Sequence, residues 1–307
     1  MCGCFKLTTP PAWVSKILVM NQPIGEEEIF ILPEGDKISF SQLIDDLSRT
    51  RLILMGETHD QVEHHRIEMK VLQGLLEKGK DVAVGMEMFE RSQQPILDYW
   101  SQGLLTDEEF LKEVNWDTAW GMDYSLYKGI LDEIKGQHLK VLGLNIERDL
   151  VRKVAQSGMG GLSPEDKEKL PEMDLTDRQH RRYIASIYKS HHGGSAKDFE
   201  NFYEAQCLWD EAMAETFSQF LQSPEGRGKT VLIFAGRGHV VFDFGIPKRS
   251  YRRTSIPYKT IVLKEWSKEM SEDFSFGGNA SSLADFLWIT RPTPPEKKRP
   301  RMGVVLI

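Results

Sequence analysis

Short apolar runs alternate along the chain with longer segments in which apolar residues recur every three or four positions. The short runs have the length of buried strands, and the longer segments have the spacing of amphipathic helices. Strands that alternate with helices pair into a mostly parallel sheet covered on both faces. The pattern therefore predicts an α/β fold, with a mostly parallel sheet flanked by helices on both faces and a smaller helical subdomain. The expected core strands are residues 52–55, 82–86, 141–145 and 230–235.

Breaks in this pattern divide the chain into parts. A stretch rich in glycine, proline and charge follows the third core strand and its helix, and it precedes a segment with helical spacing only. Near the end of the chain, the apolar residues 287–290 predict an edge strand before a basic, proline-rich tail. We expect four parts: an irregular N-terminal segment (1–27), an α/β domain (28–265) with a helical insertion (159–222), and a loosely ordered C-terminal extension (266–307).

Polar side chains with useful chemistry follow each of the four core strands. The carboxyl ends of parallel strands lie at one edge of a sheet, and ligands bind at that edge. We therefore expect one site built from the residues after all four strands. These residues are Glu57 and His59 after the first strand, Glu87 after the second, Asn145 and Arg148 after the third, and Arg237 and His239 after the fourth.

Two helices bring further polar groups toward this site. His64 and His65 lie at the start of the helix that follows the first strand, at the end nearest the site. Gln206 and Asp210 share the aromatic stripe of a helix at about 197–221, so both should point inward. A buried carboxylate without a partner is costly. Asp210 should therefore have a partner or line a wet pocket.

Three kinds of chemistry fit these residues. Glu57, His59, Glu87 and His239 have the donor atoms to bind a divalent metal such as zinc, manganese or iron. The same four residues have the groups for acid–base hydrolysis, with Arg237 stabilising charge. Alternatively, the aromatic helices hold haem, whose propionates bind arginine or a helix N-terminus. The competing interpretation of the aromatic stripe is an ordinary core.

An ordered set of short motifs, within about residues 28–265, resembles the ChaN family of bacterial haem-binding lipoproteins. The ordered set is specific, whereas Gly-Glu-x-His alone is a weak signal. The motifs are Gly56-Glu57-Thr58-His59-Asp60, His64-His65, Met86-Glu87-Met88-Phe89, Gly143-Leu144-Asn145, Ala205-Gln206, Trp209-Asp210, Met213-Ala214, Ala235-Gly236-Arg237-Gly238-His239 and Gly245-Ile246-Pro247.

The resemblance implies haem binding linked to iron uptake, a homodimer with haem stacked face to face between its subunits, and a tyrosine ligand to the iron. The motifs do not place that tyrosine. Tyr124 and Tyr127 follow a family-like Trp-Asp pair, and Tyr188 with His191 forms a second cluster. The residues that we expect to bind haem are Tyr124, Tyr127, Tyr188, His191, Gln206, Asp210, His64, His65 and Arg237.

The wider superfamily of this resemblance leaves a second function open. It is similar to erythromycin esterases and to TIKI and TraB proteins, some of which hydrolyse bonds. The alternative is therefore a hydrolase, an esterase or peptidase with or without a metal, that uses Glu57, His59, Glu87 and His239. A third interpretation is that these groups only hold the sheet edge together. The aromatic and histidine-rich helices favour a non-catalytic haem-binding protein.

Composition and cysteine content argue against several classes of partner and site. The net charge of −7 gives no reason to expect nucleic acid, because phosphate binding requires a basic face. No apolar run approaches the ~20 residues that cross a bilayer. Cys2, Cys4 and Cys207 form neither a disulfide framework nor a zinc motif.

The first four residues, Met-Cys-Gly-Cys, look like the end of a bacterial lipoprotein signal. In this interpretation Cys4 carries lipid and anchors the protein in the bacterial cell envelope. The alternative is two free thiols at a frayed terminus and a cytoplasmic protein.

Overall fold

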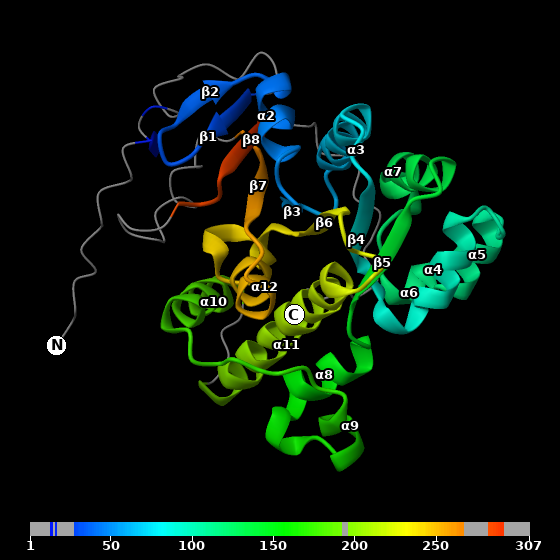
Figure 1. Ribbon diagram of the computed structural model, residues 1–307. Coiled ribbons are helices and arrows are strands. Elements are labelled where there is room, and N and C mark those ends of the chain that lie inside the picture. Colours follow the sequence, from blue (N-terminus) through cyan, green and yellow to red (C-terminus); the bar gives the residue numbers. More distant parts are fainter. Residues whose placement is uncertain (1–12, 15, 17–27, 192–195, 267–281, 292–307) are drawn as a thin grey trace.

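The computed structural model describes residues 13–14, 16, 28–191, 196–266 and 282–291 (Figure 1). Cys4, most of the expected N-terminal segment and much of the expected C-terminal extension lie outside the described residues. The side chain of His191 also lies outside them.

The core is one sheet with the strand order β2-β1-β8-β7-β3-β6-β4-β5. Every pair from β8 to β5 is parallel, and β1 pairs antiparallel with β2 and β8. The prediction of a mostly parallel sheet is therefore confirmed. The strands are β1 (Glu28–Ile31), β2 (Asp36–Ile38), β3 (Leu52–Glu57), β4 (Val82–Glu90), β5 (Lys140–Asn145), β6 (Thr230–Gly236), β7 (Tyr258–Glu265) and β8 (Phe286–Thr290).

The position of β8 corrects one expectation. The sequence predicts an edge strand at residues 287–290, but β8 lies between β1 and β7 and pairs with both. All residues of β8 are buried. A strand covered on both faces needs apolar residues without alternation, which is the reason for its Phe-Leu-Trp-Ile-Thr sequence.

Helices cover both faces of the sheet, as predicted (Figure 1). We call the two sides the α3 face, covered by α2, α3, α4 and α7, and the α11 face, covered by α11 and α12. α8 and α10 pack on α11. The α-helices are α2 (Phe40–Leu47), α3 (Val62–Glu77), α4 (Gln94–Ser101), α5 (Asp107–Glu113), α6 (Trp116–Ala119), α7 (Tyr124–Gly136), α8 (Arg148–Ser157), α9 (Pro164–Glu168), α10 (Arg178–His191), α11 (Ala196–Gln222) and α12 (Ile246–Thr254).

Alternation along β3 shows how one strand serves both faces. Leu52 and Leu54 pack in the core of the α11 face, whereas Ile53 and Met55 pack in the core of the α3 face. Successive side chains of a strand point to opposite faces. Glu57 continues the series of Ile53 and Met55, so it extends toward α3.

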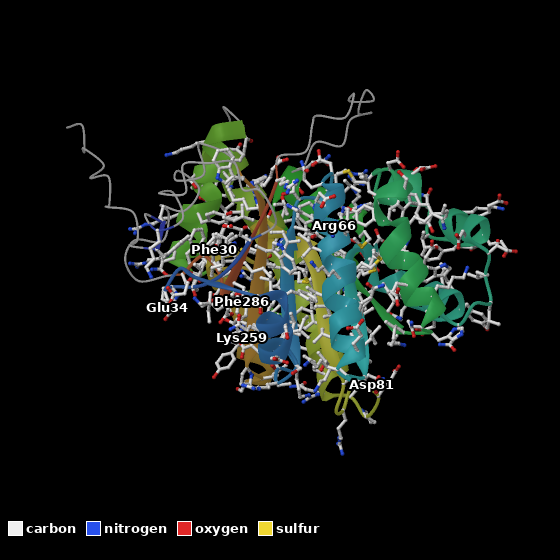
Figure 2. The ribbon with its side chains drawn as sticks, turned by 90° about the horizontal axis from the view of Figure 1, so that it is seen from above. Phe30, Glu34, Arg66, Asp81, Lys259 and Phe286 are labelled. Carbon is white, nitrogen blue, oxygen red and sulfur yellow. The ribbon has the colours of Figure 1, made fainter. Side chains whose placement is uncertain are left out.

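The functional residues lie at the carboxyl edge of the parallel strands. Figure 2 shows Arg66, near the start of α3, and Asp81, just before β4, toward opposite ends of α3. Arg66 therefore marks the carboxyl edge. At this edge a Cβ on Gly56 would lie 2.9 Å from Arg237 Cα, so only glycine lets the end of β3 approach the turn after β6 this closely. Within the described chain, no helix is long and apolar enough to cross a bilayer.

Candidate functional site

Three strand ends meet at the carboxyl edge of the sheet. Glu57 is the last residue of β3, and Glu87 lies in β4 where its pairing with β5 shifts register. β6 ends at Gly236, and a 3-10 turn (Arg237–His239) follows. The Gly236 backbone N–H donates to Glu87 Oε2 at 2.6 Å. The strand ends therefore form one connected site, as parallel-sheet geometry requires.

The first histidine of the site is held by Glu57. His59 Nδ1 donates to Glu57 Oε1 at 2.5 Å. Burial lowers the pKa of His59, but the Glu57 carboxylate outweighs it and raises the pKa to about 9. Burial likewise raises the pKa of Glu57, and the charge of His59 reverses this and lowers it. His59 and Glu57 therefore form an ion pair at neutral pH.

The second histidine is held by Asp210 of α11. His239 Nδ1 donates to Asp210 Oδ1 at 2.6 Å, and the Gln206 amide nitrogen lies 3.1 Å from the same Nδ1. Burial lowers the pKa of His239, but Glu87 and Asp210 outweigh it and raise the pKa. Burial raises the pKa of Asp210, and the charges of His239 and Arg249 reverse this and lower it. Asp210 therefore has the partner that its burial requires.

The second ring nitrogens of both histidines lie near Glu87 or near its neighbour Gly236. His239 Nε2 lies 3.5 Å from Glu87 Oε1. A Cβ on Gly236 would lie 3.0 Å from His59 Nε2 and 3.5 Å from Glu87 Oε2. The two histidine–carboxylate pairs therefore flank one carboxylate, and each carboxylate fixes its imidazole by the Nδ1 atom. The Nε2 atoms are the ring nitrogens left to face a ligand, and in the His59–Glu57 ion pair Nε2 carries a proton that it must lose before it can bind a metal ion.

Aromatic and basic side chains surround this centre. The Trp120 ring contacts His59 edge-on with 4.7 Å between centroids, and the Trp209 ring is edge-on to His239 at 6.3 Å. Both tryptophans are partly buried, and Arg237 is exposed. Asn145 Nδ2 donates to the Glu87 carbonyl at 3.3 Å. The site thus combines aromatic walls with one outward-facing cation.

Arg148 has a supporting position beside the site. Its guanidinium donates to the carbonyls of Thr118 and Ala119, at 3.1 and 2.8 Å. Those residues immediately precede Trp120, so Arg148 fixes the segment that carries this aromatic wall.

The predicted tyrosines lie in three different environments. Tyr127 is fully buried, and its hydroxyl donates to the His59 carbonyl at 3.1 Å. Burial raises the pKa of Tyr127 well above its usual value. The Tyr124 hydroxyl is buried without a hydrogen bond to the described residues, and burial raises its pKa to about 12. Tyr188 packs with Phe199 and Phe202 in an apolar cluster between α10 and α11. The structure therefore does not bring the three tyrosines together.

His64 and His65 lie behind the site, at the start of α3. The Thr58 backbone N–H donates to His64 Nδ1 at 2.9 Å, and burial lowers the pKa of His64 to about 4. His65 Nε2 donates to the His59 carbonyl at 3.1 Å, and Nδ1 donates to Glu68 Oε2 at 3.1 Å. Both histidines thus hold the chain on either side of His59 by hydrogen bonds to its backbone.

One group of possible metal donors in the structure overlaps only in part with the expected metal ligands. Among the described residues, Glu57, His65 and Glu68 each offer a ligand atom, and these atoms lie within 4.8 Å of one another. Of the four expected metal ligands, only Glu57 belongs to this group. His59 and His239 instead use their Nδ1 atoms for carboxylates.

Sequence reasoning did not select several residues that shape the site. Glu68 could have been found, because it lies three positions after His65 on the same buried face of α3. Trp120 lies in no repeating pattern of apolar residues, so the sequence did not place it at the site. His180 and Arg249 surround Asp210, at 3.5 and 3.8 Å, from two other helices. Only the packing of α10 and α12 on α11 places them there.

Residues 43–249 match a sequence-family model described as "Haem-binding uptake, Tiki superfamily, ChaN". The chain belongs to this family. The match extends from α2 into α12, so it includes Glu57, Glu87, Asp210 and His239. The predicted family resemblance is therefore confirmed, and the family is one of haem-binding proteins.

One solved structure shares the fold, and a second is a weaker match. A structure described as cofacial haem binding to ChaN of Campylobacter jejuni has a TM-score of 0.68 and 21% identity, over 88% of this chain and 99% of that one. An erythromycin esterase structure has a TM-score of 0.46 and 13% identity, over 77% of each chain. Among curated proteins, none matches this chain.

Proposed function

We propose that the protein binds haem at the carboxyl edge of the sheet. The observation that carries this proposal is the family match, because residues 43–249 contain both histidine–carboxylate pairs and Glu87. Haem is held in proteins by histidine or tyrosine at the iron, by apolar contacts with the ring, and by basic groups at the propionates. When bound, haem supplies a redox-active iron.

The side chains of the edge fit such a ligand. His59 Nε2 and Glu87 Oε2 lie beside Gly236, and His239 Nε2 lies 3.5 Å from the other Glu87 carboxylate oxygen. Trp120 and Trp209 provide apolar contacts, and the exposed Arg237 guanidinium provides a cation for a propionate. Among the candidate tyrosines, Tyr124 has the hydroxyl without a hydrogen bond to the described residues, whereas Tyr127 already donates to a carbonyl.

Haemin titration tests the proposal. We expect a Soret shift at micromolar haemin with the wild type. Tyr124→Phe, His59→Ala and His239→Ala should each change the spectrum if that residue ligates the iron. Tyr99→Phe is the matched control, because Tyr99 is an exposed tyrosine of α4. A wild-type protein that produces no Soret shift would sink the proposal.

The finer parts of the function are also proposals. We infer that haem stacks face to face between two copies of the chain; the support is the cofacial haem binding named in the description of the Campylobacter jejuni structure. Sedimentation with and without haemin tests this, since the sedimenting mass should double with haem. A monomer at saturating haem would contradict the inference.

We further propose a role in haem or iron uptake or handling in the bacterial envelope, with lipid on Cys4. The support is the Met-Cys-Gly-Cys start and the family description. Mass spectrometry of the native protein should detect the added lipid mass. A native protein with an unmodified Cys4 thiol would contradict the anchor.

Hydrolysis is the second candidate, and one observation favours it. Two histidines, each oriented by a buried carboxylate, flank Glu87, which is the geometry that acid–base catalysis uses. His59→Ala and His239→Ala should abolish turnover of an ester or peptide panel, while Glu63→Gln, at a partly buried carboxylate paired with Arg66, should not. Turnover that survives both histidine substitutions would exclude this function.

A further inference from the structure

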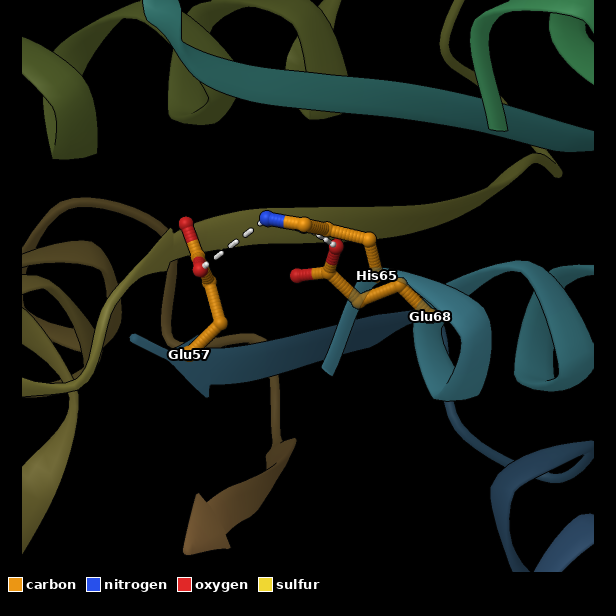
Figure 3. A group of neighbouring side chains, drawn as sticks. All are labelled: Glu57, His65 and Glu68. Atoms are coloured by element: carbon orange, nitrogen blue, oxygen red, sulfur yellow. Dashed lines mark hydrogen bonds and ion pairs between the residues drawn. The ribbon is translucent and has the colours of Figure 1, made fainter. Parts of the chain in front are cut away.

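A second group of donors lies on the α3 face, directly behind His59. Figure 3 shows Glu57 from β3 and both His65 and Glu68 from α3 directed toward one another. His65 Nδ1 is 3.1 Å from Glu68 Oε2, and His65 Nε2 is 3.9 Å from Glu57 Oε2. One ligand atom from each residue lies within 4.8 Å of the other two. Two carboxylates and an imidazole thus converge on one point.

The three side chains are almost completely removed from solvent. Glu57, His65 and Glu68 are 2%, 3% and 1% exposed. Glu57 Oε2 and Glu68 Oε1 are buried and accept no hydrogen bond from the described residues. Burial of a carboxylate oxygen without a donor or a cation is costly. The protein alone therefore leaves two carboxyl oxygens without a partner at this point, and burial raises the pKa of Glu68 to about 7.

A charged His65 does not supply the missing donors. An imidazolium has two N–H groups. The Nε2 group donates to the His59 carbonyl, and the Nδ1 group donates to Glu68 Oε2. Both donors are thus in use, and the free oxygens of Glu57 and Glu68 remain. A cation from solution would satisfy both.

We propose that Glu57, His65 and Glu68 form a binding site for a divalent transition-metal ion. Binding would release one ring proton of His65 to solvent, so that this nitrogen ligates the ion and the other keeps its N–H bond. Carboxylate and imidazole donors suit manganese, ferrous iron and zinc, and three protein ligands leave positions for water. Softer cuprous copper prefers sulfur ligands, which this group lacks.

Glu57 belongs both to this metal site and to the carboxyl edge of the sheet, where we propose that haem binds. Glu57 Oε1 holds His59, and Oε2 faces His65. A cation on Oε2 would therefore act on His59 through a single carboxylate. The inference does not rest on haem binding, because its test uses haem-free protein and the metal alone.

Titration of untagged, metal-free, full-length protein with Co²⁺ tests the site. We expect one equivalent to bind, with visible d–d bands and no thiolate charge-transfer band, and Zn²⁺ or Mn²⁺ should displace it. Glu68→Gln and His65→Gln should each weaken binding by about tenfold or more. Glu63→Gln is the matched control on α3, because Glu63 is a more exposed carboxylate paired with Arg66 at 2.9 Å.

Three results would overturn the proposal. The first is a wild-type protein that binds no cobalt, and the second is unchanged affinity in Glu68→Gln. The third is cobalt binding that is lost in Glu87→Gln and His239→Gln but kept in Glu68→Gln, which would place the metal at the sheet edge.

Thermal melting gives a second measurement of metal binding, which also applies to a variant of low stability. Zn²⁺ should raise the Tm of the wild type and of Glu63→Gln, and a similar rise in Glu68→Gln would contradict the site.

Discussion

The two faces of the sheet each bury a cluster of acids behind one histidine of the site, but they balance the charge differently. On the α11 face, Arg249 lies 3.8 Å from Asp210 and 3.1 Å from Glu211, and Arg252 and Arg253 also reach Glu211. An arginine is permanently charged. The charge of this cluster is therefore balanced by the protein itself, although Asp210 Oδ2 also accepts no hydrogen bond from the described residues.

The α3 face has no such permanent cation within its described cluster. Glu57 and Glu68 face one histidine, and two carboxylate oxygens remain without donors. The comparison shows that similar burial of acids has two solutions. One is a fixed guanidinium from a neighbouring helix, and the other is a position that a soluble cation can take.

Removal of Arg249 should have the largest effect. Arg249→Met leaves Asp210 and Glu211 buried with less positive charge, and the loss of one partner of a buried ion pair costs about 3–5 kcal/mol. Urea denaturation at neutral pH should show this loss in the free energy of unfolding. A change below 1 kcal/mol would contradict the view that the α11 face depends on its arginine.

Acid should weaken the α11 face through His180. Burial lowers the pKa of His180 from 6.5 to about 4. The folded protein therefore holds His180 neutral, while the unfolded chain protonates it below its ordinary pKa. The stability contribution is present above that value and is lost as pH falls toward the folded pKa, by about 3 kcal/mol in all.

His180→Asn tests this pH dependence. The variant should lose less stability than the wild type between neutral pH and the folded pKa of His180, as measured by urea denaturation at each pH. Parallel pH profiles of the two proteins would show that His180 does not titrate in this range.

The Glu68→Gln substitution on the α3 face should have a smaller effect without metal. Glutamine keeps an oxygen that accepts from His65 and removes an unsatisfied charge. The free energy of unfolding of metal-free protein should therefore change by less than about 1 kcal/mol, in contrast to Arg249→Met. A loss as large as that of Arg249→Met would show that the two faces are balanced alike.

The Gly236→Ala substitution adds a methyl group at the end of β6. It should leave the free energy of unfolding nearly unchanged and weaken ligand binding. In Gly236→Ala the new Cβ lies 3.0 Å from His59 Nε2 and 3.5 Å from Glu87 Oε2. We expect haemin affinity to fall several-fold, with stability within about 1 kcal/mol. Gly238→Ala is the control, because its Cβ meets nothing within 4 Å. Equal affinities in the two variants would place haem elsewhere.

Much of the fold and part of the site could be predicted from the sequence. The apolar runs and helical stripes predict the parallel core, and Glu57, Glu87 and His239 follow strands whose ends must meet. The prediction of β8 as an edge strand was wrong, because a short apolar run does not show whether a strand pairs on one side or on both. Glu68, His180 and Arg249 were missed, because their partners lie on other elements.

The sequence by itself determined which groups reach the carboxyl edge, because the direction and period of each strand are local properties. The tertiary structure alone decided how these groups are paired. Helix packing sets Asp210 against His239 and divides Glu57 between His59 and His65. It also turns the Tyr127 hydroxyl onto a carbonyl. Such pairings depend on distances between elements far apart in the chain, and no local pattern encodes those distances.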